Sequence, residues 1–164
     1  MLFKVLGLQG EAIHGGSGEW PLPEGDQPGE WLSVTGTIRA CINGLHLTPA
    51  HALMSWYRKE SRLFVAEADT TDMHMEDSSK AAFRRARLLT EVTAEWPLLK
   101  LFPQTWVYIA IRDSKENSRA NLSGANLYGA NLYGANLYGA NLHGADLGEW
   151  ERDESTGYAR RKVA

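Results

Sequence analysis

Residues 120–149 read ANLSG-ANLYG-ANLYG-ANLYG-ANLHG-ADLGE, six five-residue units in unbroken succession. A fixed period of this kind is typical of repeat architectures, in which each unit buries its apolar face against its neighbours. A period of five fits neither an α-helix nor a flat strand. Leu stands at the third position of every unit, which a disordered low-complexity tract has no reason to preserve. The sequence therefore predicts a repeat structure for this segment.

These units strongly resemble the A(D/N)LXX units of the pentapeptide-repeat family, whose chains wind into a right-handed quadrilateral β-helix with one unit per face and four per coil. The resemblance implies that the Leu and Ala positions point inward and that the Asn positions point outward. The inward set is Leu122, Leu127, Leu132, Leu137, Leu142 and Leu147, with Ala120, Ala125, Ala130, Ala135, Ala140 and Ala145.

Four units per coil would stack residues that are twenty positions apart. We therefore expect Ser123 to lie below His143. Tyr128, Tyr133 and Tyr138 would lie on three different faces rather than in one stripe, and as outward residues they are candidates for binding a partner.

Six units make only one and a half coils, which is too short to bury both ends. Either residues 1–119 and 150–164 cap the coil, or it stacks on another copy, because unpaired strand edges are templates for another chain. A protein partner or self-association into an oligomer is therefore expected. Residues 150–164 are predicted to form a hairpin with its turn at 153–157, an acidic arm facing a basic one.

Composition limits the other functions. The chain has 164 residues, a net charge of −3 and one cysteine, Cys41. Such a charge offers no basic field for nucleic-acid phosphates. The longest apolar stretch, 106–111, is far below the roughly 18 residues of a membrane span. The spacing of Cys41, His46 and His51 does not predict a metal site. We expect a cytoplasmic protein with no membrane role and no metal.

The first 119 residues are predicted to form an α+β head domain, followed by the repeat at 120–149 and a C-terminal cap at 150–164. Strands are expected at 2–8, 31–39, 44–48, 62–68, 83–92 and 106–111. Thr48 and Pro49 would begin a helix that contains Leu53, Trp56 and Tyr57. Residues 69–80 are expected to form an acidic loop.

A long Gly/Pro-rich loop covers residues 14–29, and loops of this length are often functional. Trp20 lies in this loop and Trp31 at its exit. Exposed aromatic residues often anchor partners, so both are candidate partner-binding residues.

The head also resembles known N-terminal domains. Lys4-Val-Leu-Gly, His14-Gly-Gly, Trp20-Pro-Leu-Pro and Cys41-x-Asn-Gly-Leu-His-Leu look like an uncharacterised domain that precedes pentapeptide repeats in actinobacterial and phage proteins. This resemblance carries no known activity, but it suggests an actinobacterial or phage origin.

A second resemblance is to the small rifamycin-inactivating ADP-ribosyltransferases. It rests on His14-Gly, Leu45-His-Leu-Thr48, a helix with Trp56, and the segments 63–67 and 87–96. It implies that His14 would hold the nicotinamide ribose, that His46 replaces a tyrosine, and that Gly16 replaces a threonine. The nearest candidates for the acidic third residue are Asp72, Glu76 and Asp77. The implied ligand-binding set is His14, Gly15, Gly16, His46 and Thr48, with His14 and His46 as the catalytic candidates.

Two functions follow as hypotheses. The first is a non-enzymatic binding protein without a cofactor, whose repeat mediates docking or self-assembly. The alternative is a domain that binds NAD or an ADP-ribose derivative, or an ADP-ribosyltransferase, using the region of His14 and His46. Loss of a defined acidic partner would remove electrostatic stabilisation of an oxocarbenium-like transition state and leave a binder.

Overall fold

The computed structural model describes residues 1–14, 16–56, 60–75, 79–112 and 139–163, together with residues 122, 123, 125, 127, 128, 132 and 137. The chain divides into two compact units, Met1–Trp96 and Pro97–Ala164. We call them the head unit and the tail unit. Residues 97–112, which the sequence assigned to the head domain, thus group with the repeat.

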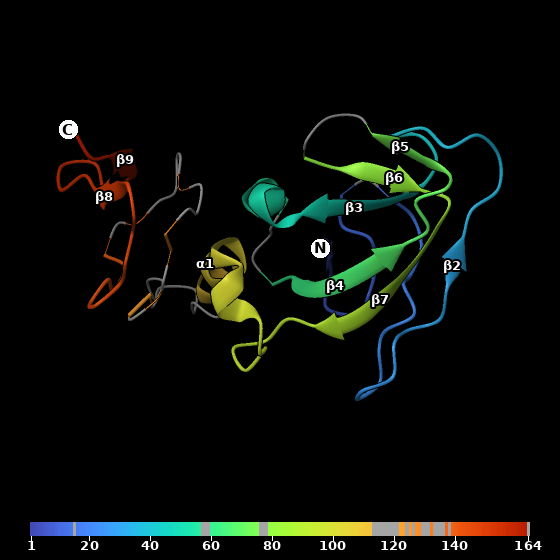
Figure 1. The fold of residues 1–164 in the computed structure, drawn as a ribbon, viewed down its shortest axis with the longest axis horizontal. Coiled ribbons are helices and arrows are strands. Elements are labelled where there is room, and N and C mark those ends of the chain that lie inside the picture. The colour runs from blue at the N-terminus through green and yellow to red at the C-terminus, as the bar shows by residue number, and fades with distance from the viewer. Residues whose placement is uncertain are drawn as a thin grey trace. The chain divides into compact units, whose positions relative to one another are not determined.

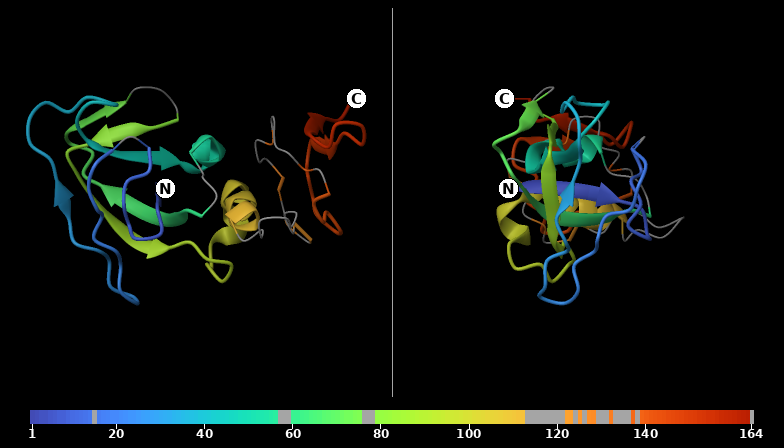
Figure 2. Two further views of the ribbon diagram at one scale, coloured as in Figure 1. Left: turned by 180° about the vertical axis from the view of Figure 1, so that it is seen from behind. Right: turned by 90° about the vertical axis from the view of Figure 1, so that its right-hand side faces the viewer.

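Seven antiparallel strands form the sheet of the head unit, in the order β2-β7-β4-β1-β3-β6-β5 (Figure 1). Their bounds are β1 Leu2–Leu6, β2 Leu32–Ser33, β3 Leu45–Pro49, β4 Arg62–Ala68, β5 Met73–Met75, β6 Ala81–Phe83 and β7 Arg85–Glu91. Figure 2 shows the same strands from behind. The strands predicted at 2–8, 44–48, 62–68 and 83–92 are confirmed in essence as β1, β3, β4 and β7.

The strand predicted at 31–39 is largely wrong, because only Leu32–Ser33 pairs with a neighbour. Gly36 has a φ of +82°, which turns the chain away from an extended path. The Asn43 amide then donates to the carbonyls of Thr35 and Thr37, at 2.7 and 3.1 Å. These bonds hold residues 34–43 as a loop.

The helix predicted after Thr48 is a short 3₁₀ helix, η1, at Ala50–Ser55. Thr48 does not cap it: the Thr48 hydroxyl donates to the Ser79 carbonyl at 2.6 Å. Leu53 is fully buried as expected, and Tyr57 lies outside the described residues. In its described part the head unit is therefore almost entirely β, and the segment predicted as an acidic loop contains β5.

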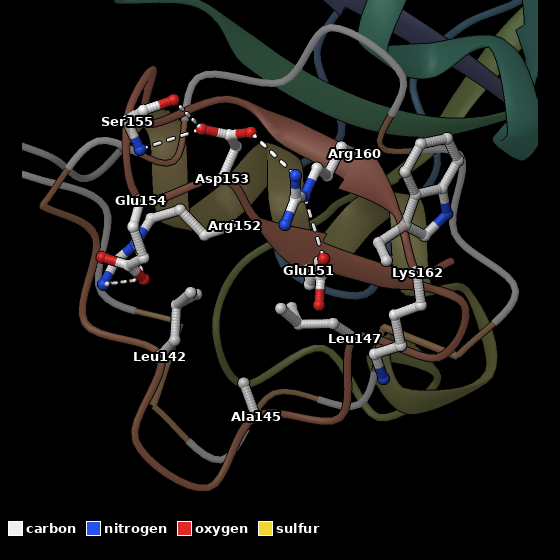
Figure 3. Close-up of a pocket in the computed structure, with 11 residues that line it drawn as sticks. Leu142, Ala145, Leu147, Glu151, Arg152, Asp153, Glu154, Ser155, Arg160 and Lys162 are labelled. Atoms are coloured by element: carbon white, nitrogen blue, oxygen red, sulfur yellow. Dashed lines mark hydrogen bonds and ion pairs between the residues drawn. The ribbon is translucent and has the colours of Figure 1, made fainter. Parts of the chain in front are cut away.

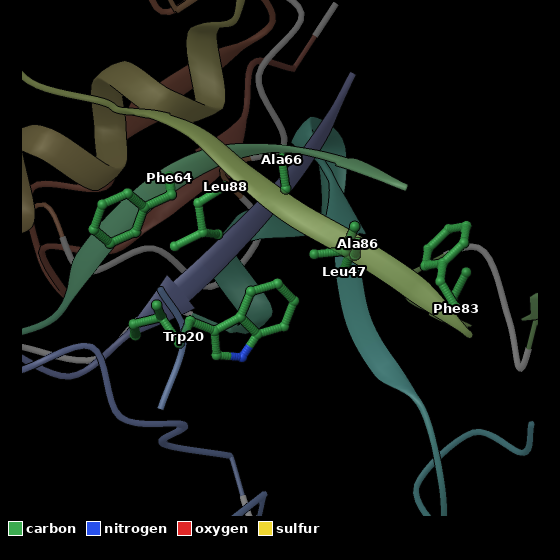
Figure 4. Packing of buried hydrophobic residues seen from close by; sticks show 9 residues of the cluster. Trp20, Leu47, Phe64, Ala66, Phe83, Ala86 and Leu88 are labelled. Carbon is green, nitrogen blue, oxygen red and sulfur yellow. The ribbon is translucent and has the colours of Figure 1, made fainter. Parts of the chain in front are cut away.

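Trp20 belongs to the core of the head unit. It is 6% exposed and clusters with Leu47, Phe64 and Leu88, which lie on three different strands (Figure 4). The Trp20 amide donates to the Gly10 carbonyl at 3.0 Å, and the Gly29 amide donates to the Leu88 carbonyl at 2.9 Å. The end of the Gly/Pro-rich loop is therefore tied to β7, and the indole of Trp20 is packed into the core. The expectation that Trp20 is an exposed anchor is corrected, since burying this large apolar ring stabilises the fold.

The tail unit begins with the 3₁₀ helix η2, Leu99–Leu101, and the α-helix α1, Pro103–Arg112. The prediction of a strand at 106–111 is wrong. Pro103 stands at the first helical position, where its missing N–H costs nothing. The amide and the hydroxyl of Thr105 both donate to the Phe102 carbonyl, at 2.9 and 2.6 Å, and satisfy the first turn. None of the helices in the described part of the chain is long and apolar enough to cross a membrane.

The described leucines between 122 and 137 are buried as expected, whereas Leu142 and Leu147 are half-buried. Leu127 and Leu132 are fully buried, whereas Tyr128 is 71% exposed. The Leu127 amide donates to the Asp146 carbonyl at 2.7 Å, and the Leu122 amide donates to the Asn141 carbonyl at 2.8 Å. No helix or strand is assigned to the described residues between 122 and 149.

The predicted stacking of Ser123 below His143 is also present. The Ser123 hydroxyl donates to the His143 carbonyl at 3.1 Å. The same spacing continues beyond the last unit, because the Leu137 amide donates to the Gly157 carbonyl at 2.8 Å. The C-terminal segment therefore extends the stacked layer of the repeat.

The C-terminal hairpin is confirmed as β8, Trp150–Arg152, paired with β9, Ala159–Arg161. Its acidic arm faces its basic arm: Arg160 contacts Glu151 at 2.9 Å and Asp153 at 3.2 Å (Figure 3). Trp150 is buried, whereas Tyr158 is 48% exposed. Trp150 therefore packs into the interior of the tail unit, whereas the ring of Tyr158 is largely open to solvent.

Asp153 organises the hairpin turn. Its carboxylate accepts bonds from the Ser155 hydroxyl and amide and from the Thr156 amide, and these bonds lower its pKa to about 2.

The stabilisation of the hairpin by the Asp153 carboxylate is complete above the ordinary pKa of 3.8 and is lost as the pH falls through about 2. We expect acid to weaken the hairpin over this range and Asp153→Ala to remove the dependence. Carboxyl titration by NMR checks the pKa; a value near 3.8 would contradict the assignment.

Candidate functional site

A pocket of about 450 Å³ opens within the head unit, a volume in the range of small-molecule sites. β1, β3, the loops before β3, the start of the Gly/Pro-rich loop and the end of η1 supply its walls. We call it the head pocket. Its polar and aromatic lining consists of Phe3, Lys4, His14, Ser17, Trp20, Cys41, Asn43, His46, Thr48, Trp56 and Lys80.

The head pocket brings together the described members of the predicted ligand-binding set. His14, Gly16, His46 and Thr48 come from two segments that are about thirty residues apart, and all four line this pocket. Gly15 lies outside the described residues. The resemblance to the ADP-ribosyltransferases implied this set, and the fold places its described members around one cavity.

His14 is held by Trp56. Its Nε2 atom donates to the Trp56 carbonyl, since a carbonyl can only accept. The imidazole also meets the Trp56 ring edge-on, with the ring centroids 5.3 Å apart. The pair joins the loop after β1 to the end of η1 and presents two aromatic rings to the pocket.

His46 is held by the turn before β3. Its Nε2 atom accepts a bond from the Cys41 amide at 2.9 Å, so Nε2 carries a lone pair and Nδ1 carries the proton of the neutral ring. Cys41 itself has a φ of +59°, an uncommon conformation for a residue with a side chain. The bond from this amide to His46 stabilises the turn and fixes the imidazole.

Two lysines that the sequence analysis did not single out also line the pocket. The Lys4 ammonium lies 5.0 Å from the centre of the Trp20 ring and donates to the His46 carbonyl at 3.2 Å. The Lys80 ammonium lies 5.0 Å from the centre of the Trp56 ring and 2.9 Å from the Cys41 sulfur. The sequence could have pointed to Lys4 as an unusual residue, because it stands in the middle of an apolar strand. Charged side chains are rarely buried at such positions unless they have a partner.

Gly44 allows the loop and the sheet to approach each other at the pocket wall. It has a φ of +148°, and a Cβ atom there would lie 2.8 Å from the Cβ of Ala82. We expect Gly44→Ala to destabilise the head unit by about 1–3 kcal/mol, because strain and overlap act together. Gly18→Ala is the matched control, since Gly18 has a φ of +118° with no atom within 4 Å of the added carbon. Urea unfolding measures both variants. If Gly44→Ala and Gly18→Ala lose the same free energy of unfolding, the contact with Ala82 does not contribute to the loss.

The acidic residue that the transferase resemblance requires does not lie in the described lining. Asp72 pairs with Arg84 at 2.6 Å and does not line the pocket. Glu76 and Asp77 fall outside the described residues. Among the described residues of the lining, none is acidic.

The described members of the predicted partner-binding set are divided between the two units. Trp31 is half-buried beneath two guanidinium groups, with Arg85 at 4.4 Å and Arg87 at 4.8 Å from its ring centre. Tyr128 is the exposed tyrosine of the tail unit's described repeat, whereas Tyr133 and Tyr138 lie outside the described residues. Trp20 belongs to the core, as described above.

Comparison with known proteins identifies the repeat segment. Residues 118–149 match a family model described as pentapeptide repeats in eight copies. No curated protein and no solved structure matches the chain. The match supports a β-helix-like tail, and nothing in the comparisons supports the two resemblances noted for the head.

Proposed function

We propose that this chain is a binding protein whose head unit holds a small organic ligand in the head pocket. The convergence of His14, His46 and Thr48 on one cavity is the observation that carries the proposal. Aromatic walls with a few polar groups are typical of ligand sites, in which the rings supply contact area and the polar groups orient the ligand.

NAD or an ADP-ribose derivative is the specific ligand class that this proposal favours. A planar base would stack on one of the two perpendicular rings of His14 and Trp56, and the Thr48 region would face a sugar. The described lining contains no carboxylate to stabilise a positive charge on a ribose, which favours binding over ADP-ribosyl transfer.

Thermal unfolding with NAD, ADP-ribose and nicotinamide tests this function. A ligand present at about 100 times its dissociation constant is expected to stabilise the protein by about 2.7 kcal/mol. His14→Ala should abolish the shift, whereas His143→Ala, an exposed residue of the repeat, should leave it unchanged. If none of the three ligands raises the unfolding temperature, NAD and ADP-ribose derivatives are excluded as ligands of the head pocket.

We further propose that the tail forms short right-handed quadrilateral coils and docks on a protein partner or on a second copy. The stacking bonds between residues about twenty apart support the coil. A groove of about 650 Å³ beside the hairpin supports docking, because Leu142 and Leu147 are only half-buried at its edge (Figure 3). A strictly monomeric mass by light scattering at micromolar concentration would exclude the second copy.

A further inference from the structure

Lys4 is a half-buried cation on β1 whose ammonium contacts neutral groups. Its ammonium contacts the His46 carbonyl and the Trp20 ring. Within the described part of the chain, no carboxylate forms an ion pair with it. On the sheet, Lys4 stands directly opposite Phe64, an apolar and fully buried residue.

Such a position penalises the charged form of the amine. Burial alone lowers the pKa of Lys4 from 10.5 to about 8, so the group is still mostly protonated at neutral pH. Buried charges in proteins are normally paired, because leaving the water without a partner is costly. A charge with a carbonyl and a ring as its recorded partners is only partly compensated.

A second lysine lies in the described lining of the head pocket. Lys80 brings a second ammonium to the wall, and none of the lining residues that the structure describes is acidic. The other titratable groups of the described lining are His14, Cys41 and His46. Among the described lining residues, Lys4 and Lys80 are thus the only lysine, arginine or carboxylate side chains, in a chain whose net charge is −3.

We propose that the head pocket is an oxyanion site, in which Lys4 binds a phosphate or carboxylate group of the ligand. The inference rests on the proposed ligand-binding function and names the group that the ligand must carry. The oxyanion would supply the missing counter-charge to Lys4, with Lys80 adding to the attraction. The ring of the ligand would lie against Trp56 and His14.

The proposal is tested by the pKa of the Lys4 amine, measured by NMR on lysine-labelled protein. The probes are inorganic phosphate, acetate and ADP-ribose, with chloride at equal ionic strength as the blank. A bound oxyanion should raise the pKa of Lys4 by at least one unit, which corresponds to tenfold tighter binding to the protonated form. Lys162, an exposed residue of the tail unit, is the internal control and should not shift. A response to phosphate but not to acetate would assign the site to phosphate, and the reverse to carboxylate.

Lys4→Met separates this inference from the proposed function. We expect the affinity for ADP-ribose to fall at least tenfold in Lys4→Met and to stay unchanged in Lys162→Met.

If ADP-ribose binds through His14 while the pKa of Lys4 and the affinity of Lys4→Met stay unchanged, the oxyanion site is refuted and the ligand-binding function stands. If phosphate or acetate raises the pKa of Lys4 but no organic ligand binds, the oxyanion site stands and the proposed ligand is refuted. If none of the probes moves the pKa of Lys4, the oxyanion site is refuted.

Discussion

Replacing Lys4 with methionine is expected to stabilise the unliganded protein at neutral pH. Methionine fills a similar volume without a charge, so the desolvation penalty disappears. The difference between a pKa of about 8 and the ordinary 10.5 corresponds to at most about 3 kcal/mol. Lys4 keeps some contact with solvent, and the variant loses the bond to the His46 carbonyl, so we expect a net gain of about 1–2 kcal/mol.

The pH dependence of this gain has a definite sign. Between about pH 8 and pH 10.5 the unfolded chain holds a proton on Lys4 that the folded protein has lost, so the stability of the wild type rises with pH. The advantage of Lys4→Met should therefore be full below about pH 8 and should shrink as the pH approaches 10.5. Urea unfolding at several pH values measures it. A variant that is less stable than the wild type at neutral pH would show that Lys4 is already compensated.

Truncation of Leu127 should have the largest effect on the tail unit. Leu127 is fully buried, and its amide donates to the Asp146 carbonyl in the next layer. Leu127→Ala leaves a cavity in the interior of the repeat and is expected to cost about 2–5 kcal/mol. The hydrogen-exchange rates of the Asp146 and Leu127 amides measure the loss of stability at this place in the repeat.

The adjacent Tyr128 supplies the control, because its side chain is 71% exposed. Tyr128→Ala should change the stability by less than about 0.5 kcal/mol. Equal effects of the two substitutions would mean that the Leu positions do not form the interior of the repeat, and the predicted inward and outward assignment would be wrong.

Periodic patterns in the sequence predicted β4 and the stacking within the repeat. The alternation in 62–68 gave β4 with its observed bounds, because apolar side chains on such a strand face the core. The five-residue period predicted the contact between Ser123 and His143. The family resemblance pointed to four candidate ligand-binding residues that the structure describes, although their convergence on one pocket depends on the pairing of β1 with β3.

The elements that the sequence did not predict depend on helix-start residues that were overlooked or on contacts distant in the sequence. The apolar run at 106–111 suits a buried strand or a buried helix, and Pro103 with Thr105 begins a helix there. Trp20 stands in a Gly/Pro-rich segment that looks mobile, yet the Gly29 bond to the Leu88 carbonyl holds that segment against β7. Lys4 has no signal of its own for ligand binding, because its role depends on the neighbours that the sheet gives it.

The most direct measurement is a map of amide chemical shifts as ADP-ribose is added to ¹⁵N-labelled protein. We predict that the shifts concentrate at Gly16, Cys41, Gly44 and His46, around the head pocket, while residues 139–163 of the tail unit stay unchanged. Shifts confined to the tail unit, or no shifts at saturating ligand, would contradict a ligand site in the head unit.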